Sequence, residues 1–224
     1  MSRNAWIIFV VISMTVLGGL IMLSRQNKVE IGADVKTDRI VKPAVANGNI
    51  GDHVFGSDEG KAVLVEYGDF QCPACRSAHP LLKEVKEKYK DDLTFIFRNN
   101  PITLKHPNAK VASAAAEAAG LQGKFWEMHD ILYEQQLSWA NASIDDRQSF
   151  FVDMAKEIEV PDIDKFQADM KSKEITDKIS FDLALGRKDG VTGTPTIFFN
   201  GERLESDVWA DIDKLSALID KTIK

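Results

Sequence analysis

The chain has 224 residues, of which 44% are hydrophobic and 28% charged, and its net charge is −6 at pH 7. This length suits one domain with a sizeable core plus an additional segment. The acidic balance argues against nucleic acid as a partner, because nucleic-acid-binding domains carry clustered basic charge. The sequence contains 2 cysteines, and these leave none over for structural bridges if both take part in chemistry.

Residues 1–24 are predicted to form an N-terminal membrane anchor or signal anchor. Ala5 to Leu23 carries no charge, and a helix over these positions spans roughly 28 Å, close to the hydrocarbon thickness of a bilayer. Arg3 precedes this run and Arg25 follows it. The alternative is a cleaved signal peptide, which has a shorter apolar core and a small-residue cleavage site that Ile21 to Ser24 does not offer. We expect the following domain to be exported in both cases, and secreted if the segment is cleaved.

The next two segments lead from the apolar run to the cysteines. Residues 25–49 are polar and mixed in charge, and they are predicted to form a mostly irregular tether. His53 to Phe55 is predicted to be a short first strand. The apolar run Ala62 to Val65 predicts a buried strand that leads directly toward both cysteines. A folded domain is therefore expected over residues 50–224.

Cys72, Pro73, Ala74 and Cys75 stand between this strand and a helix, which is predicted from the spacing of the apolar residues that follow. Pro73 suits the first helical position, where its missing N–H costs nothing. The N-terminus of a helix stabilises a thiolate, so the pKa of Cys72 should lie below the value of about 8.5 for a free thiol. Cys75 lies one turn further in and should be less exposed. The two thiols together predict a redox pair.

Structural interpretations of the cysteine pair are less favoured. With His79 the pair has a metal-like spacing, but a zinc site needs about four ligands and no second cysteine pair exists. No metal is therefore expected. A haem attachment site needs a histidine directly after the second cysteine, where Arg76 stands. A purely structural disulfide across so short a loop would restrict the unfolded chain little.

The rest of the chain alternates strand and helix patterns. Leu93 to Arg98 predicts a strand parallel to the preceding one, within a βαβ unit. A long helical region is predicted from Asn108 to Lys188, with an alanine-rich first helix and apolar stripes that face a core. Thr196 to Phe199 is predicted to be a strand, and Asn200-Gly201 is a hairpin turn signal. A final helix is predicted over residues 212–223.

The segment from Glu66 to Cys75 resembles the active site of the thioredoxin superfamily, and most of all its DsbA-like branch, of the membrane-anchored bacterial type. A second matching motif, Val191 to Thr196, lies far along the chain, and Pro80 matches a helix proline of many relatives. The resemblance covers most of the chain from about His53 onward. It implies an α/β thioredoxin-like fold with a helical domain, about residues 105–188, inserted between the βαβ half and the C-terminal ββα half, after an N-terminal transmembrane helix.

The resemblance also implies the roles of particular residues. Cys72 and Cys75 are expected to be the catalytic pair, and Glu66 is expected to lie buried beneath them and to relay the proton of Cys75. The Thr194–Pro195 peptide bond is expected to be cis, and the Thr194 backbone to pair with an extended substrate segment beside Pro195. The family chemistry needs no bound cofactor or metal.

The function implied by the resemblance is thiol–disulfide exchange on unfolded or partly folded exported proteins that carry cysteine thiols. Introduction of disulfides is the favoured direction, with a membrane quinone-linked protein as the reoxidising partner. The Pro73-Ala74 dipeptide leaves the direction open, so an exported reductase or isomerase is the alternative. A membrane-tethered polypeptide-binding module without enzymatic activity is a further alternative, against which the intact cysteines argue. The domain is expected on the extracytoplasmic side, at the cell surface or in the periplasm.

Overall fold

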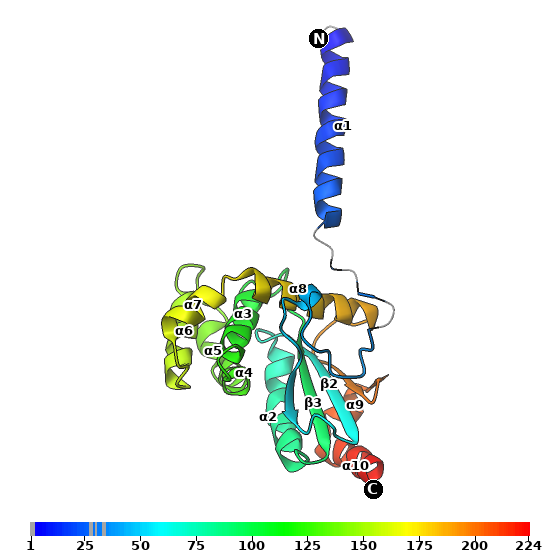
Figure 1. Ribbon diagram of the computed structural model, residues 1–224, viewed down its shortest axis with the longest axis vertical. Helices are drawn as coiled ribbons and strands as arrows, with labels where there is room; N and C mark the ends of the chain where they lie inside the picture. Colours follow the sequence, from blue (N-terminus) through cyan, green and yellow to red (C-terminus); the bar gives the residue numbers. More distant parts are fainter. Residues whose placement is uncertain (1–2, 27–28, 30, 33–34) are drawn as a thin grey trace. The chain divides into compact units, whose positions relative to one another are not determined.

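The protein divides into two units, Met1–Glu30 and Ile31–Lys224, in a computed structural model that describes residues 3–26, 29, 31–32 and 35–224. The first unit contains helix α1 (Arg3–Gln26), drawn in Figure 1. Large apolar side chains from Trp6 to Leu17 are exposed on it. Within the described ranges, no helix combines the length and apolarity that crossing a membrane requires. The predicted helix therefore forms, but its prediction as a membrane anchor is not confirmed.

The second unit is built on a five-stranded sheet with the strand order β1-β3-β2-β4-β5. Its strands are β1 (His53–Gly56), β2 (Ala62–Gly68), β3 (Leu93–Asn99), β4 (Thr196–Phe199) and β5 (Glu202–Arg203). β2 and β3 are parallel, which confirms the predicted βαβ unit, whereas the other neighbouring strands are antiparallel. The central strand β2 pairs on both sides, with Leu64 opposite Phe95 of β3 and Phe199 of β4. The segment that leads to the cysteines is thus held by a neighbouring strand on each side.

Helices cover the sheet and form a large insertion between β3 and β4 (Figure 1). α2 (Pro73–Lys88) connects β2 to β3, and α9 (Ser206–Trp209) and α10 (Ile212–Ile223) follow the last strand. The insertion consists of α3 (Ala109–Gly120), α4 (Phe125–Glu134), α5 (Gln136–Trp139), α6 (Arg147–Glu157), α7 (Ile163–Asp169) and α8 (Lys173–Lys188). It confirms the predicted helical region. The short elements α9 and η1 (Val45–Asn47) were not predicted.

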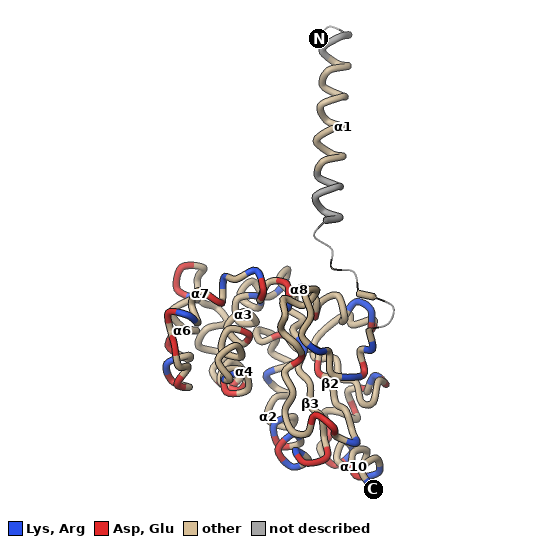
Figure 2. Tube along the Cα trace, in the orientation of Figure 1, with Lys and Arg blue, Asp and Glu red and all other residues tan. Residues whose placement is uncertain are grey.

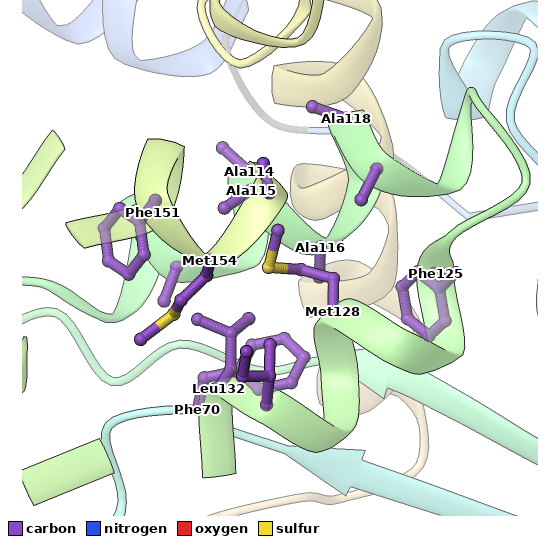
Figure 3. Close-up of a cluster of buried hydrophobic side chains, with 14 of the residues drawn as sticks. Phe70, Ala114, Ala115, Ala116, Ala118, Phe125, Met128, Leu132, Phe151 and Met154 are labelled. Carbon is purple, nitrogen blue, oxygen red and sulfur yellow. The ribbon is translucent and has the colours of Figure 1, made fainter. Parts of the chain in front are cut away.

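Two hydrophobic clusters hold these layers together. One joins the sheet to α2 and α10, and the other joins the inserted helices to the residues around the cysteines. Figure 3 shows the second cluster, in which small side chains of α3 face Met128, Leu132 and Met154. Because alanine has a short side chain, α3 can approach its neighbours closely and still exclude voids. Both cysteines belong to this cluster, so the insertion supports the site directly.

The predicted tether, residues 25–49, differs from expectation in its second half. Arg98 of β3 donates to the main-chain carbonyls of Thr37 at 2.6 Å and of Arg39 at 2.9 Å. Its guanidinium also pairs with Asp52 at 2.8 Å, and both side chains of this pair are fully buried. Residues from Thr37 onward are therefore bound to the domain. Of the remaining tether, residues 27–28, 30 and 33–34 lie outside the described residues.

Candidate active site

Both cysteines lie where β2 has ended and α2 begins, as the sequence predicts. Cys72 is the N-cap residue of α2, and Pro73 occupies the first turn. Cys72 is 7% exposed and Cys75 is fully buried, and both are free thiols. The Cys72 N–H donates to the Asp69 carbonyl at 2.9 Å, which closes the turn before the helix. Cys72 is therefore the more accessible sulfur of the pair.

The two thiols lie in opposite electrostatic environments. A hydrogen bond from the Cys75 thiol, aided by the main-chain N–H groups of Ala74 and Cys75, lowers the pKa of Cys72 to about 5 even though burial opposes this. Burial raises the pKa of Cys75 well above its ordinary value, and the nearby Cys72 and Glu66 raise it further. At neutral pH Cys72 is therefore a thiolate and Cys75 a neutral thiol, which is the division of roles that exchange chemistry requires.

The second predicted motif meets the first one in space. The Thr194–Pro195 peptide bond is cis, which confirms the prediction. Sγ of Cys72 lies 3.4 Å from the Thr194 carbonyl oxygen, to which Cys72 donates when it is protonated. This contact joins residues that are 122 positions apart in the chain, immediately before β4 begins. The geometry therefore brings Cys72, Thr194 and Pro195 into one site.

Glu66 lies on β2, where it pairs with Phe97 of β3 and Ile197 of β4, and its side chain is buried. Burial raises the pKa of Glu66 to about 8, although the charge of Lys86 favours the ionised form. The carboxyl group is therefore largely protonated at neutral pH. Its effect on the pKa of Cys75 agrees with the expected place of Glu66 near the pair.

Asp69 fixes the turn that precedes Cys72, and the sequence reasoning did not assign it a role. Its buried carboxylate accepts hydrogen bonds from the N–H groups of Gln71 and Ile102, both at 2.8 Å. Nδ1 of His106 lies 2.7 Å from the same carboxylate. An aspartate that bonds the backbone two residues on is a recognisable turn signal, but its bonds to the loop after β3 depend on the fold.

Gln136 holds the same turn from the helical insertion. Its side-chain amide donates to the carbonyl of Phe70 at 2.7 Å and to that of Cys72 at 3.0 Å, and the side chain is buried. A single glutamine in a helical stretch gives no sequence signal of this kind, so the residue was missed. Gln136 is a positioning residue, because it acts on the reactive sulfur through the backbone.

We expect Gln136→Leu to lower the free energy of unfolding by about 1–3 kcal/mol, because it leaves buried carbonyls without donors. The loosened turn should also raise the pKa of Cys72 toward the ordinary value, which the absorbance of the thiolate at different pH values would show. Gln135→Leu is the matched control, since Gln135 bonds to Glu157 at the surface. An unchanged Cys72 pKa in Gln136→Leu would show that the hydrogen bonds of Gln136 to the turn have only a structural role.

A group of side chains with metal-binding atoms lies on α2 and α4. Among the described residues, the group able to hold a metal consists of His79, His129 and Asp130, whose ligand atoms lie within 4.8 Å of one another. The structure does not place Cys72 or Cys75 in this group. The Asp130 carboxylate is already paired with Lys86 at 3.1 Å and Lys83 at 3.0 Å. Two ammonium groups beside the carboxylate disfavour a further cation there.

Comparison with known families agrees with this geometry. A family model described as thioredoxin matches residues 48–221. The chain belongs to the thioredoxin family. The match includes both cysteines and the cis proline, and it begins close to the first predicted strand.

Solved structures show that this thioredoxin-family protein has the DsbA-type fold. BdbD from Bacillus subtilis is 22% identical with a TM-score of 0.67, and the alignment covers 83% of this chain and 97% of that one. A thioredoxin-like oxidoreductase from Silicibacter pomeroyi is 26% identical with a TM-score of 0.62, covering 79% and 95%. The thiol-disulfide exchange protein alpha-DsbA2 from Wolbachia pipientis is 21% identical with a TM-score of 0.64, covering 76% and 86%.

Curated relatives of the thioredoxin-family domain include much longer proteins. The Na(+)/H(+) antiporter NhaA 1 of Salinispora arenicola is 36% identical over 168 residues, which are 75% of this chain and 24% of the antiporter. NhaA 1 of Mycolicibacterium vanbaalenii is 37% identical over 156 residues, or 68% and 24%. The chain thus spans about a quarter of these curated relatives (24%), and the antiporter names describe those whole proteins.

Proposed function

We propose that the protein is a thiol–disulfide oxidoreductase that introduces disulfide bonds into exported proteins. The observation that carries this proposal is the opposed ionisation of its two thiols, with the pKa of Cys72 at about 5 and that of Cys75 raised. A sulfur with a low pKa is a good leaving group, and its stable thiolate favours the reduced enzyme, so the disulfide form is a strong oxidant. The Wolbachia neighbour, described as a thiol-disulfide exchange protein, supports the same chemistry.

The proposed reaction starts from a Cys72–Cys75 disulfide. A client thiolate attacks Sγ of Cys72, a mixed disulfide forms, and the sulfur of Cys75 leaves. A second client thiolate then attacks the client sulfur of the mixed disulfide, and Cys72 leaves as a thiolate. Two client thiols are oxidised to a disulfide and the enzyme pair is reduced. The Thr194 backbone, beside Pro195, would hold the client as an added strand next to Cys72.

Glu66 is proposed to transfer the proton of Cys75. In the oxidising direction its protonated carboxyl supplies a proton to the leaving sulfur of Cys75, and during reoxidation the carboxylate takes this proton back. A carboxyl with a pKa of about 8 can exist in both forms near neutral pH, which this role requires. Glu66 thereby spares the buried Cys75 from carrying an unsolvated charge.

The raised pKa of Glu66 predicts a pH-dependent stability, best measured on the disulfide form, in which neither thiol titrates. The folded state binds the proton more tightly than the unfolded state, whose pKa is about 4.3. The free energy of unfolding should therefore fall as pH rises from about 5 to about 8. Urea unfolding should show this decline in the wild type and a weaker decline in Glu66→Gln. Glu87→Gln, an exposed change on α2, serves as the control, and equal slopes in both variants would contradict the assignment.

The proposed substrates are unfolded or partly folded exported proteins with cysteine thiols, and the proposed place of action is extracytoplasmic. Each turnover leaves the Cys72–Cys75 pair reduced, so an oxidant must restore it. We propose a membrane quinone-linked protein as this partner. Disulfides persist in oxidising compartments and are reduced in the cytosol. This supports both the extracytoplasmic place of action and a partner that supplies oxidising equivalents.

The competing direction is reduction or isomerisation, in which the Cys72 thiolate attacks a client disulfide with the same residues. An assay of both directions tests the proposal. The disulfide form should oxidise a reduced, unfolded protein that has two cysteines, with one client disulfide formed per enzyme molecule. Faster reduction of a client disulfide by the dithiol form would favour a reductase. Client binding without reaction in either direction would favour a polypeptide-binding module.

A further inference from the structure

A pocket of about 260 Å³ lies within the helical insertion, and it contains none of the residues of the candidate active site. Side chains from α3, α6, α8 and the turn after α7 surround it. Its apolar lining consists of Val111, Ala114, Ile144, Met170, Ile175 and Ile179. Ile175 and Ile179 are buried, whereas Ile144, at the rim, is 75% exposed. The pocket therefore offers an apolar lining that is open to a ligand.

The charged residues of this pocket all have one sign. Lys110, Arg147 and Lys171 line it, and no Asp or Glu among the described residues does so. The chain as a whole has a net charge of −6, and its acidic and basic residues are interspersed along the trace (Figure 2). A purely basic set on an acidic protein is thus a local feature, and it creates a potential that favours anions.

Arg147 differs from the two lysines because it is held in place. Its Nη1 donates to Oδ1 of Asn108 at 3.3 Å, and Asn108 is buried. Lys110 and Lys171 are exposed surface residues of α3 and of the turn after α7. A fixed guanidinium that shares the pocket with two exposed lysines is suited to bind one carboxylate, because guanidinium presents paired donors in a planar arrangement.

We propose that this pocket binds a small amphipathic anion, a free carboxylate that carries an apolar chain. The lining accounts for both parts of the ligand, since the apolar floor receives the chain and the three cations receive the head group. The volume lies just below the range of about 300–1,000 Å³ for sites of drug-sized ligands, which favours a slender ligand. This inference goes beyond the proposed redox function and does not depend on it.

Binding of sodium decanoate to the full-length protein, measured by titration calorimetry, tests the proposal. Lys110→Glu combined with Lys171→Glu should weaken decanoate binding at least tenfold, because it reverses the charge at the head group. Lys105→Glu combined with Lys221→Glu is the matched control, since it makes the same change in net charge at exposed lysines outside the pocket. The control should bind decanoate as the wild type does.

Three further measurements make the result specific. Acetate lacks the chain and decyl maltoside lacks the charge, so each should bind at the pocket at least tenfold more weakly than decanoate. Ala114→Leu should also weaken binding, because the larger side chain occupies the floor of the pocket. The exposed apolar face of α1 can bind alkyl chains too, but the charge reversal leaves such binding unchanged. Equal affinity of the Lys110/Lys171 double variant and its control would therefore overturn the proposal.

Discussion

Replacing Cys72 with Ser should reduce disulfide transfer to the uncatalysed rate, a loss of about a thousandfold or more, because the variant cannot form the internal disulfide and its remaining thiol, Cys75, is buried. The serine hydroxyl is of similar size but stays protonated at neutral pH and cannot carry the sulfur exchange. The measurement is the oxidation rate of a reduced, unfolded client in the presence of the oxidised wild type and of the Cys72→Ser variant. An undiminished oxidation rate in Cys72→Ser would contradict the assignment of Cys72 as the exchanging thiol.

Cys75→Ser is the matched variant and should behave differently. Its Cys72 thiolate still attacks a client disulfide, but no second enzyme thiol remains to release the client. A mixed disulfide between Cys72 and the client should therefore accumulate and appear as a band on a non-reducing gel that reductant removes. Accumulation of the same adduct in Cys72→Ser would show that the assignment of the two thiols is reversed.

Asp52→Ala should lower the free energy of unfolding by about 3–5 kcal/mol, because it leaves buried positive charge without its partner. Asp52 accepts hydrogen bonds from Arg98 at 2.8 Å and from the Val41 N–H at 2.8 Å, and Lys178 lies 3.5 Å away. Chemical denaturation of the two proteins measures the difference. Asp169→Ala, which removes an ion pair with the exposed Lys165, is the control and should cost no more than about 1 kcal/mol.

The same network sets a direction for acid unfolding. Burial opposes ionisation of Asp52, but the charges of Arg98 and Lys178 outweigh it and lower the pKa of this carboxyl. The stabilisation from Asp52 is therefore present above the unfolded pKa of about 3.9 and is lost as pH falls below it. The variant should accordingly lose less stability than the wild type between about pH 5 and pH 2. A parallel loss in both proteins would contradict the role of Asp52.

The parts of the site that could be predicted from the sequence are those whose residues lie close together in short motifs. Cys72 and Cys75 stand at the junction of a strand and a helix, and the residues around them determine the helix start within a few positions. The cis peptide at Thr194–Pro195 came from the resemblance, because the dipeptide alone fits an ordinary trans turn. The order of strands and helices was also predictable, since the hydrophobic periods of 2 and 3.6 residues are local properties.

The supporting residues could not be predicted, because their roles depend on distant partners. Gln136 reaches the Cys72 carbonyl from a helix 64 residues away, and nothing in its neighbours indicates this. Arg98 was part of a predicted strand, yet its guanidinium binds the segment that was expected to be a mostly irregular tether. Apolar composition at the N-terminus predicted a helix correctly, but the membrane role inferred from it is not confirmed.

The reduction potential of the Cys72–Cys75 pair, measured by equilibrium with glutathione, decides between the two directions of exchange. The low pKa of Cys72 predicts a strongly oxidising pair, with a value closer to that of DsbA at about −120 mV than to that of thioredoxin at about −270 mV. A value near about −270 mV would contradict the proposed oxidase and identify the protein as a reductase.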